Sequence, residues 1–338
     1  MSRSKRKSKT QDSPSGVLES SPRGKSGVDD ATMLSSYTSD WIAGFNEFWF
    51  TPRRPTLLGL IRIFTGLIAF WTLLVWTFEL STFFGSDGLL PPGYRSQLGA
   101  AAAWSHLDWF TGSALLWVHL AGLVVVAMFT VGVWTRATSV LTALLIISYG
   151  NRSIGAGFGL DQINAFMCLY CAVGNSGGRF SVDQWLANRK SSSSGTLLVR
   201  RDTSTNIAVR LMQIHLCVVY FFAAVGKLQG DTWWTGEAVW LALASYEYQT
   251  IDMTWLASYM PIVSLMTLTS MFWELLYPAL VWPRLTRPVM LAIAIPVHLG
   301  IGFCMGMPSF GLIMLVANLS FVEWSESDES VESHEASF

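Results

Sequence analysis

Eight long apolar runs constrain the fold of this 338-residue chain more than any other feature of its sequence. A membrane-spanning helix needs roughly 20 mainly apolar residues, and backbone in lipid must satisfy its hydrogen bonds within helices or a closed barrel. We therefore predict an all-α, polytopic membrane bundle of about eight transmembrane helices. The predicted spans are 57–80, 112–134, 136–152, 161–175, 206–228, 258–282, 287–306 and 308–322.

Two of these spans, 136–152 and 161–175, are short, so the glycine-rich segment 155–159 either breaks one long helix or begins a re-entrant segment. The distribution of basic residues favours keeping both. With eight spans and both termini cytoplasmic, 17 Lys and Arg residues fall in inside segments and three in outside loops, as the positive-inside rule requires. We expect a multi-pass integral membrane protein, in the cytoplasmic membrane if the source is bacterial.

The composition supports this class of protein. Charged residues make up 13% of the chain and apolar residues 51%, whereas about a quarter of a soluble domain is charged. This balance excludes nucleic acid as a partner and makes membrane lipid the expected environment. We expect a disordered basic tail over 1–40, a transmembrane domain over 41–324 and an acidic cytoplasmic tail over 325–338.

Two long outside segments, 81–111 and 229–257, are too aromatic to be plain tethers. The second suits a helix lying in the outer membrane interface, with Trp233 and Trp234 as interfacial aromatic residues. Together the two segments are predicted to roof a cavity that opens to the outside.

The fifth predicted span carries a polar face. Arg210, Gln213, Tyr220 and Lys227 follow one another at spacings of three, seven and seven residues, which places them on one side of a helix. Such a face should point into the bundle or a wet cavity, because polar groups facing lipid are costly. A desolvated Lys227 would suit a general base, and the alternative is a lysine that reaches the outer headgroups.

Glu274 is the only acid deep in a predicted span, so it must be protonated, paired or exposed to water. Lys227, His298 or an arginine are its candidate partners. Pro278 and Pro296 place both Glu274 and His298 near helix irregularities, where cavities form. A purely structural helix-to-helix hydrogen bond is the alternative for both residues.

The remaining ionisable and sulfur-bearing residues are interpreted as structural. Arg62 and Arg210 are expected to reach the cytoplasmic headgroups by snorkelling, whereas His119 and His215 are expected to make helix contacts. The pair Cys168-x-x-Cys171 lies inside a span, so packing is favoured over redox chemistry. No metal site is predicted, because the histidines do not cluster with acids or cysteines at ligand spacing.

Three stretches, in this order, resemble the horizontally transferred transmembrane (HTTM) domain family, which includes the vitamin K-dependent gamma-glutamyl carboxylases. Residues 210–239, RLMQIHLCVVYFFAAVGKLQGDTWWTGEAV, are similar to its R-x-x-Q, G-x-K-L and W-x-x-G pattern. Residues 149–185 resemble its segment ending in S-V/L-D, and the stretch from Glu274 to Phe321 resembles its last helix pair.

The resemblance implies a catalytic role for Lys227, which matches the lysine that deprotonates vitamin K hydroquinone in the carboxylases. By the same resemblance His298 and Glu274 would line the pocket of Lys227, and we assign them as catalytic residues with it. The residues assigned to the substrate or quinol pocket are Asn151, Arg152, Gln213, Tyr220, Trp233 and Trp234. The implied reactants are reduced vitamin K or menaquinol, with O2 and CO2 as co-substrates. A peptide or protein substrate would approach from the extracytoplasmic side.

The chain also departs from the carboxylases. It has Asn151-Arg152 where the animal enzymes have Asn-His, and an acidic tail follows the last predicted span directly. A quinol-oxidising or epoxidising reaction is therefore favoured over carboxylation of a tethered protein. The alternative is a non-enzymatic membrane factor for peptide maturation, export or immunity. A transporter is disfavoured, because no repeat symmetry or paired broken helices are evident.

Overall fold

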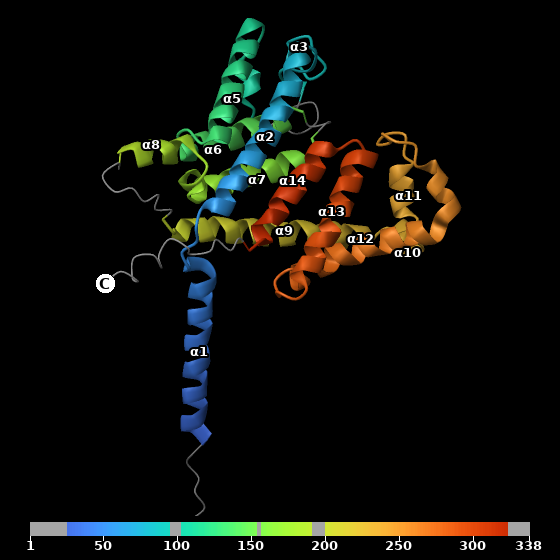
Figure 1. Cartoon of the computed structure of the whole chain (residues 1–338). Helices are drawn as coiled ribbons and strands as arrows, with labels where there is room; N and C mark the ends of the chain where they lie inside the picture. The colour runs from blue at the N-terminus through green and yellow to red at the C-terminus, as the bar shows by residue number, and fades with distance from the viewer. Residues whose placement is uncertain (1–25, 95–102, 154–156, 191–199, 324–338) are drawn as a thin grey trace, which may run out of the picture. The chain divides into compact units, whose positions relative to one another are not determined.

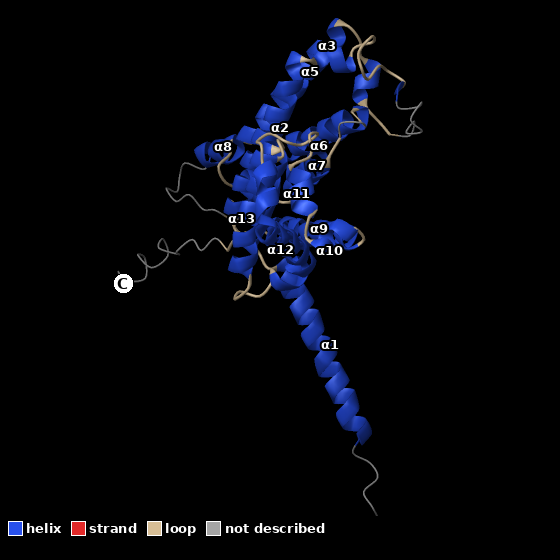
Figure 2. Cartoon of the chain, turned by 90° about the vertical axis from the view of Figure 1, so that its right-hand side faces the viewer, coloured by secondary structure: helices blue, strands red, loops and turns tan. Residues whose placement is uncertain are grey.

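The computed structural model describes residues 26–94, 103–153, 157–190 and 200–323, and the chain divides into two units, residues 1–47 and 48–338. The described residues form helices and turns and contain no strand (Figures 1 and 2). The elements are α1 (Ser26–Phe50), α2 (Thr56–Phe78), α3 (Leu80–Phe84), η1 (His106–Trp109), α5 (Ser113–Val131), α6 (Thr135–Arg152), α7 (Gly159–Val173), η2 (Ser176–Gly178), α8 (Val182–Lys190), α9 (Thr203–Leu228), α10 (Asp231–Thr235), α11 (Ala238–Leu243), η3 (Thr254–Tyr259), α12 (Met260–Leu280), α13 (Arg287–Cys304), α14 (Pro308–Asn318) and η4 (Leu319–Phe321).

Every predicted span coincides with a helix, and the all-α membrane bundle is confirmed. Within the described residues, five helical segments are long and apolar enough to cross a membrane: Thr56–Phe78, Ser113–Val131, Thr203–Leu228, Thr254–Leu280 and Arg287–Cys304. Helices α7 and α14 are shorter, and 15 residues of α7 rise only about 22 Å against a hydrocarbon core of about 30 Å. The total of eight spans therefore stays a prediction.

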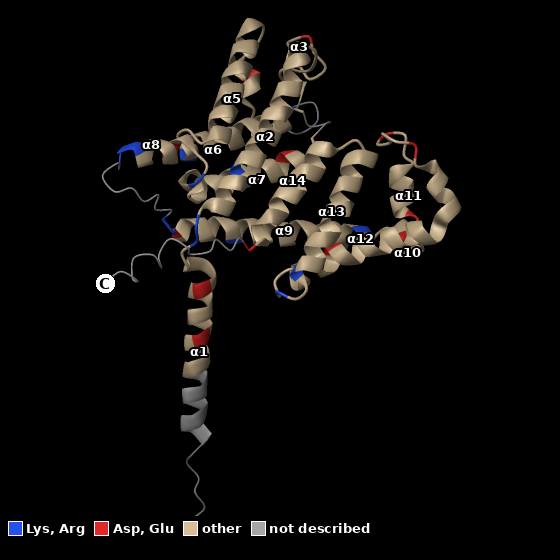
Figure 3. Ribbon diagram, in the orientation of Figure 1, with Lys and Arg blue, Asp and Glu red and all other residues tan. Residues whose placement is uncertain are grey.

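Charged residues lie mainly at the ends of the apolar helices and in the segments between them. Lys and Arg lie on α8, at the start of α9 and in the turn between α12 and α13, whereas the bodies of the apolar helices carry few charges (Figure 3). This is the pattern expected when helix bodies are solvated by lipid and helix ends by water. Which end faces the cytoplasm stays a prediction.

The segments outside the spans differ in part from expectation. Helix α1 begins at Ser26, within the stretch 1–40 that is expected to be a disordered tail. Residues 1–25 and the acidic tail from residue 325 lie outside the described residues. The segment 229–257 contains two short helices, α10 and α11, and their position in the membrane interface stays a prediction. The other segment that is predicted to lie outside, 81–111, contains α3 and η1.

Close helix approaches depend on glycine at two positions. A Cβ atom on Gly66 of α2 would lie 2.4 Å from the Thr130 hydroxyl of α5, and one on Gly311 of α14 would lie 2.3 Å from the His298 carbonyl of α13. No larger side chain fits at either contact, since both distances are below van der Waals contact. Small residues at membrane helix interfaces allow such close packing.

Arg62 is fully buried, so the snorkelling expected for it is wrong. Its guanidinium donates to the carbonyls of Ser176 at 2.6 Å and Phe180 at 2.5 Å, and more weakly to that of Arg179 at 3.4 Å. These carbonyls belong to the segment between α7 and α8. The buried charge therefore connects α2 to this segment through neutral acceptors.

Asp183 caps the N-terminus of α6 from a different helix, α8. Its carboxylate accepts hydrogen bonds from the Trp134 amide at 2.9 Å and from the Thr135 amide and hydroxyl at 2.8 and 2.6 Å. Burial acts to raise the pKa of Asp183, but these bonds and the charge of Arg62 outweigh it and hold that pKa below its ordinary value. The aspartate of the S-V-D signature is thus a helix cap.

We expect Asp183→Ala to lower the free energy of unfolding by about 1 kcal/mol, the usual value of a lost helix cap. Because the pKa of Asp183 is lower in the folded state, its contribution is complete above the unfolded aspartate value of about 3.9 and is lost as the pH falls through the folded value. Thermal unfolding in detergent between pH 7 and pH 3 measures both effects. The exposed Asp87→Ala is the control, and an equal loss in both variants would contradict the capping role.

Candidate functional site

Lys227 and Glu274 form an ion pair between α9 and α12. The lysine Nζ donates to Glu274 Oε2, and the side chains are 21% and 11% exposed. The ring of Trp233, from α10, lies 5.1 Å from Nζ, as in a cation–π contact. Of the three candidate partners for Glu274, the structure selects Lys227.

The positions of the two residues follow from the faces of their helices. Lys227 is in the last turn of α9, and Tyr220 lies two turns before it on the same face. Glu274 shares a face of α12 with Met271 and Tyr277, both of which are fully buried. Because α9 and α12 pack side by side, these two faces meet.

A buried hydrogen-bond chain joins four helices next to this pair. Tyr277 Oη of α12 donates to Asn318 Oδ1 of α14 at 2.7 Å, and Asn318 Nδ2 donates to Tyr220 Oη of α9 at 2.9 Å. Tyr220 Oη in turn lies 2.6 Å from His298 Nε2 of α13. The order of donors follows because an amide nitrogen only donates and its oxygen only accepts.

This order favours one tautomer of His298. Because the Tyr220 hydroxyl accepts a hydrogen bond from Asn318, its own O–H is available to donate to Nε2, and this arrangement leaves no hydroxyl donor unpaired. Nε2 is then the acceptor, and the imidazole proton lies on Nδ1. Nδ1 is buried and has no partner among the described residues. His298 therefore offers an unused buried donor, a feature typical of binding sites.

The ion pair and the hydrogen-bond chain form one site. Trp273 and Tyr277, on either side of Glu274 in the sequence, contact the Tyr220 ring at centroid distances of 4.8 and 4.3 Å. We call this group the Lys227 site, and its members are Lys227, Glu274, Tyr220, His298, Tyr277 and Asn318.

Asn151 and Arg152 belong to a different place. Asn151 Nδ2 donates to the Trp104 carbonyl at 2.7 Å, and Arg152 forms an ion pair with Asp108 of η1. Arg152 Nη2 also donates to the Phe84 carbonyl at 3.4 Å. The cation at the Asn-His position of the carboxylates is thus paired at the end of α6 and does not contact the Lys227 site.

Two phenylalanines lie between these two places. The Phe310 ring is 6.4 Å from His298 on one side and 6.3 Å from Phe158 on the other. Phe158, together with Asn151 and Asp161, lines a cavity of 460 Å³ between α6 and α7. Of the pocket residues predicted from the sequence, Asn151 therefore lines this cavity and is not part of the Lys227 site.

Gln213 and Trp234 are also separate from the Lys227 site. Gln213 Nε2 donates to the Ser320 carbonyl at 2.7 Å, and its Oε1 accepts from Arg210, near the opposite end of α9. Trp234 is 56% exposed and donates to the Leu228 carbonyl at 2.9 Å. Trp233 is the tryptophan of this pair that reaches Lys227.

Sequence reasoning missed Tyr277 and Asn318, which complete the hydrogen-bond chain. It examined ionisable groups, whereas these two are neutral at ordinary pH. Asn318 had a usable signal, since it is the only side-chain amide in the run 308–322. Tyr277 follows Glu274 by three residues and thus shares its helix face.

His119 and His215 each contact neighbouring helices. His119 lies 2.8 Å from the Thr77 hydroxyl and also contacts Tyr149, and His215 lies 2.9 Å from the Tyr170 hydroxyl. Cys168 and Cys171 are free and buried. Across the part of the chain that the structure describes, no three His, Cys, Asp or Glu side chains come together as metal ligands.

Residues 164–325 match the family model of the HTTM domain. This part of the chain is an HTTM domain. The match contains the whole Lys227 site, whereas Asn151 and Arg152 precede it. HTTM domains are found in vitamin K-dependent carboxylase-like membrane proteins. No curated protein and no solved structure matches the chain.

Proposed function

We propose that this HTTM protein is a quinol-dependent membrane enzyme that oxygenates reduced vitamin K or menaquinol, with Lys227 as the base. The observation that carries the proposal is the Lys227–Glu274 ion pair, placed at the end of an apolar helix and beside an aromatic cluster. Charges within membrane helices are costly and are typical of functional sites. A quinol is an apolar ring with hydroxyl groups, so its ring could pack against the aromatic cluster while a hydroxyl group meets the ion pair.

The pair offers a route to a neutral amine. While Lys227 is protonated it cannot accept a proton, but transfer of that proton from Nζ to Glu274 Oε2 leaves two neutral groups. Low dielectric surroundings favour this exchange, since they penalise separated charges. The free amine can then take the hydroxyl proton of a quinol, as a general base does.

The neighbouring groups have complementary roles in this proposal. The Nδ1 proton of His298 would orient a carbonyl or hydroxyl oxygen of the ring, because it has no partner among the described residues. Trp233 and Trp273 would exclude water on either side. Oxygenation converts a quinol and O2 into a quinone epoxide and water, and coupling to CO2 would extend the reaction to carboxylation of a glutamate in a peptide substrate.

Aerobic incubation of the purified protein with reduced vitamin K or menaquinol tests this function. We expect mass spectrometry to detect quinone epoxide with the wild type and a rate lower by about 100-fold or more with Lys227→Ala, the usual effect of losing a general base. Asp87→Ala should react as the wild type. The absence of epoxide from folded wild-type protein would reject the proposal for these quinols.

A second function has its own support in the same geometry. Glu274 neutralises Lys227, and the pair would equally hold α9 and α12 together in a non-enzymatic membrane factor for peptide maturation, export or immunity. In that case the physiological activity would survive replacement of the charged pair by two neutral residues of similar size. An enzyme that uses Lys227 as a base would lose its activity on the same replacement.

A further inference from the structure

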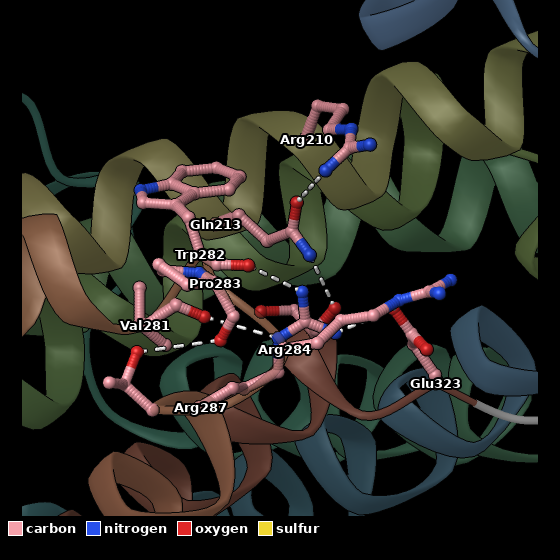
Figure 4. Close-up of polar contacts among 10 residues, drawn as sticks. Arg210, Gln213, Val281, Trp282, Pro283, Arg284, Arg287 and Glu323 are labelled. Atoms are coloured by element: carbon pink, nitrogen blue, oxygen red, sulfur yellow. Dashed lines mark hydrogen bonds and ion pairs between the residues drawn. The ribbon is translucent and has the colours of Figure 1, made fainter.

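Four arginines gather at the end of α9 opposite to the Lys227 site. Arg53, just before α2, pairs through its backbone with Asp202 at the start of α9, and Arg210 lies two turns further along α9. Arg284 and Arg287, at the turn between α12 and α13, share the carboxylate of Glu323, whose charge also acts on the pKa of Arg53. Arg210 and Lys227 are separated by about 25 Å along the helix. We call these four residues the arginine cluster, and Figure 4 shows three of them, Arg210, Arg284 and Arg287.

Most of the contacts that fix the cluster are with neutral groups. Arg210 donates to the Phe48 carbonyl at 3.1 Å and to Gln213 at 2.9 Å, and its guanidinium stacks 4.1 Å above the Phe48 ring. Arg287 donates to the carbonyls of Val281 and Trp282 at 3.1 and 2.7 Å. These contacts orient the guanidinium groups without neutralising their charge.

Among the described residues, Glu323 is the one carboxylate in ion-pair contact with the cluster. It lies 2.6 Å from Arg287 and 3.7 Å from Arg284. The hydrogen bond from Arg287 is the largest cause that lowers the pKa of Glu323, and the charges of Arg284 and Arg53 act in the same direction. One carboxylate against four guanidinium groups leaves an excess of three positive charges.

Two of the arginines have unused donors. The Arg53 guanidinium makes no hydrogen bond to any described residue, although its backbone pairs with Asp202. Burial lowers the pKa of Arg53, with Glu323 raising it and Arg287 lowering it. Arg284 is 85% exposed, and its ion pair with Glu323 is long. Both side chains can therefore donate to a further anion.

Exposed apolar residues lie next to Arg284. Leu285, directly after Arg284, is 88% exposed, and Val289 is exposed one turn later. Exposed apolar side chains beside arginines are expected where a membrane surface brings acyl chains and phosphates together. A dissolved phosphate ion has no apolar group that could contact Leu285 and Val289, whereas a phospholipid has acyl chains.

We propose that the arginine cluster binds the phosphate group of an anionic phospholipid at the membrane surface. Guanidinium groups bind phosphate oxygens through paired hydrogen bonds, and arginines that are already oriented lose little entropy on binding. Arg53 and Arg284 would contact the phosphate, while Arg210 and Arg287 supply positive potential from fixed positions. This inference does not depend on the proposed enzymatic function.

Native mass spectrometry of the full chain in detergent tests the proposal with phosphatidylglycerol and phosphatidylcholine at equal concentration. We expect the wild type to bind phosphatidylglycerol preferentially. The double variant Arg53→Gln with Arg284→Gln should bind it about tenfold more weakly, because each arginine adds to the electrostatic attraction for an anionic lipid. The matched control is Arg136→Gln, an exposed arginine of α6 outside the cluster. It should bind as the wild type does.

Other outcomes would overturn the proposal. An equal loss in Arg136→Gln would mean that basic residues attract lipid diffusely, without a site. Displacement of the lipid by inorganic phosphate alone would assign the cluster to free phosphate. Unchanged binding in the double variant, as expected if the acidic sequence after Glu323 neutralises the cluster, would also reject it. Thermal unfolding of each variant checks that it is folded.

Discussion

Replacing Lys227 by methionine is expected to abolish quinol oxygenation and to destabilise the protein. In the double variant Lys227→Met with Glu274→Gln, stability should return but activity should not. The single variant leaves the Glu274 carboxylate 11% exposed and without its lysine. Loss of one partner of a buried ion pair costs about 3 kcal/mol or more, and the partial exposure of Lys227 favours the lower figure. The double variant removes the unpaired charge and keeps the apolar contacts. Thermal unfolding and epoxide formation, measured on the same samples, separate the two effects.

Lys227→Arg provides the matched control for this prediction. Arginine keeps the positive charge and can pair with Glu274, but it does not lose its proton in proteins and so cannot serve as a base. We expect this variant to be nearly as stable as the wild type and inactive. Epoxide formation by Lys227→Arg would contradict the role of Lys227 as base, and a stable Lys227→Met would contradict the energetic role of the pair.

The positions of the helices could be predicted because lipid imposes a simple rule on sequence. Any segment crossing the bilayer must be long, apolar and helical, so the apolar runs alone locate α2, α5, α9, α12 and α13. The same rule does not decide α6, α7 and α14. Their lengths are near or below the minimum, and burial against other helices can replace lipid contact.

The polar face of α9 was also predictable, since helical periodicity alone places Tyr220 and Lys227 together. The partner of Glu274 was not, because Lys227, His298 and the arginines lie on separate segments. Choosing among them requires knowing which helices pack side by side. The close packing of α9 on α12 supplies that information, and no local sequence pattern contains it.

Arg62 shows a further limit of sequence reasoning. A cation near the end of an apolar run usually reaches the headgroups, because its long side chain can extend to water. Here the carbonyls of Ser176 and Phe180 come from a segment more than 100 residues away in the chain and provide acceptors inside the protein. These backbone carbonyls take the place of water as hydrogen-bond acceptors for the guanidinium group.

We expect Arg62→Met to be among the most destabilising single substitutions in this protein. Methionine keeps much of the apolar volume but removes the donors to the Ser176 and Phe180 carbonyls, which lie in buried or half-buried surroundings. Hydrogen bonds to a charged group contribute about 1.5–3 kcal/mol each, so we expect a total loss of about 3–5 kcal/mol. Thermal unfolding and the monodisperse fraction in size-exclusion chromatography measure the effect.

The comparison with Arg62→Lys identifies the cause of this loss. Lysine keeps the charge but cannot reproduce the planar fork that reaches both carbonyls, so its stability should lie between those of Arg62→Met and the wild type. Arg136→Met, on the exposed surface of α6, should unfold as the wild type does. If Arg62→Lys were as stable as the wild type, the charge alone would hold α2 to the α7–α8 segment. If Arg62→Met were stable, the carbonyls would have to find other donors, and the buried guanidinium would have no structural role.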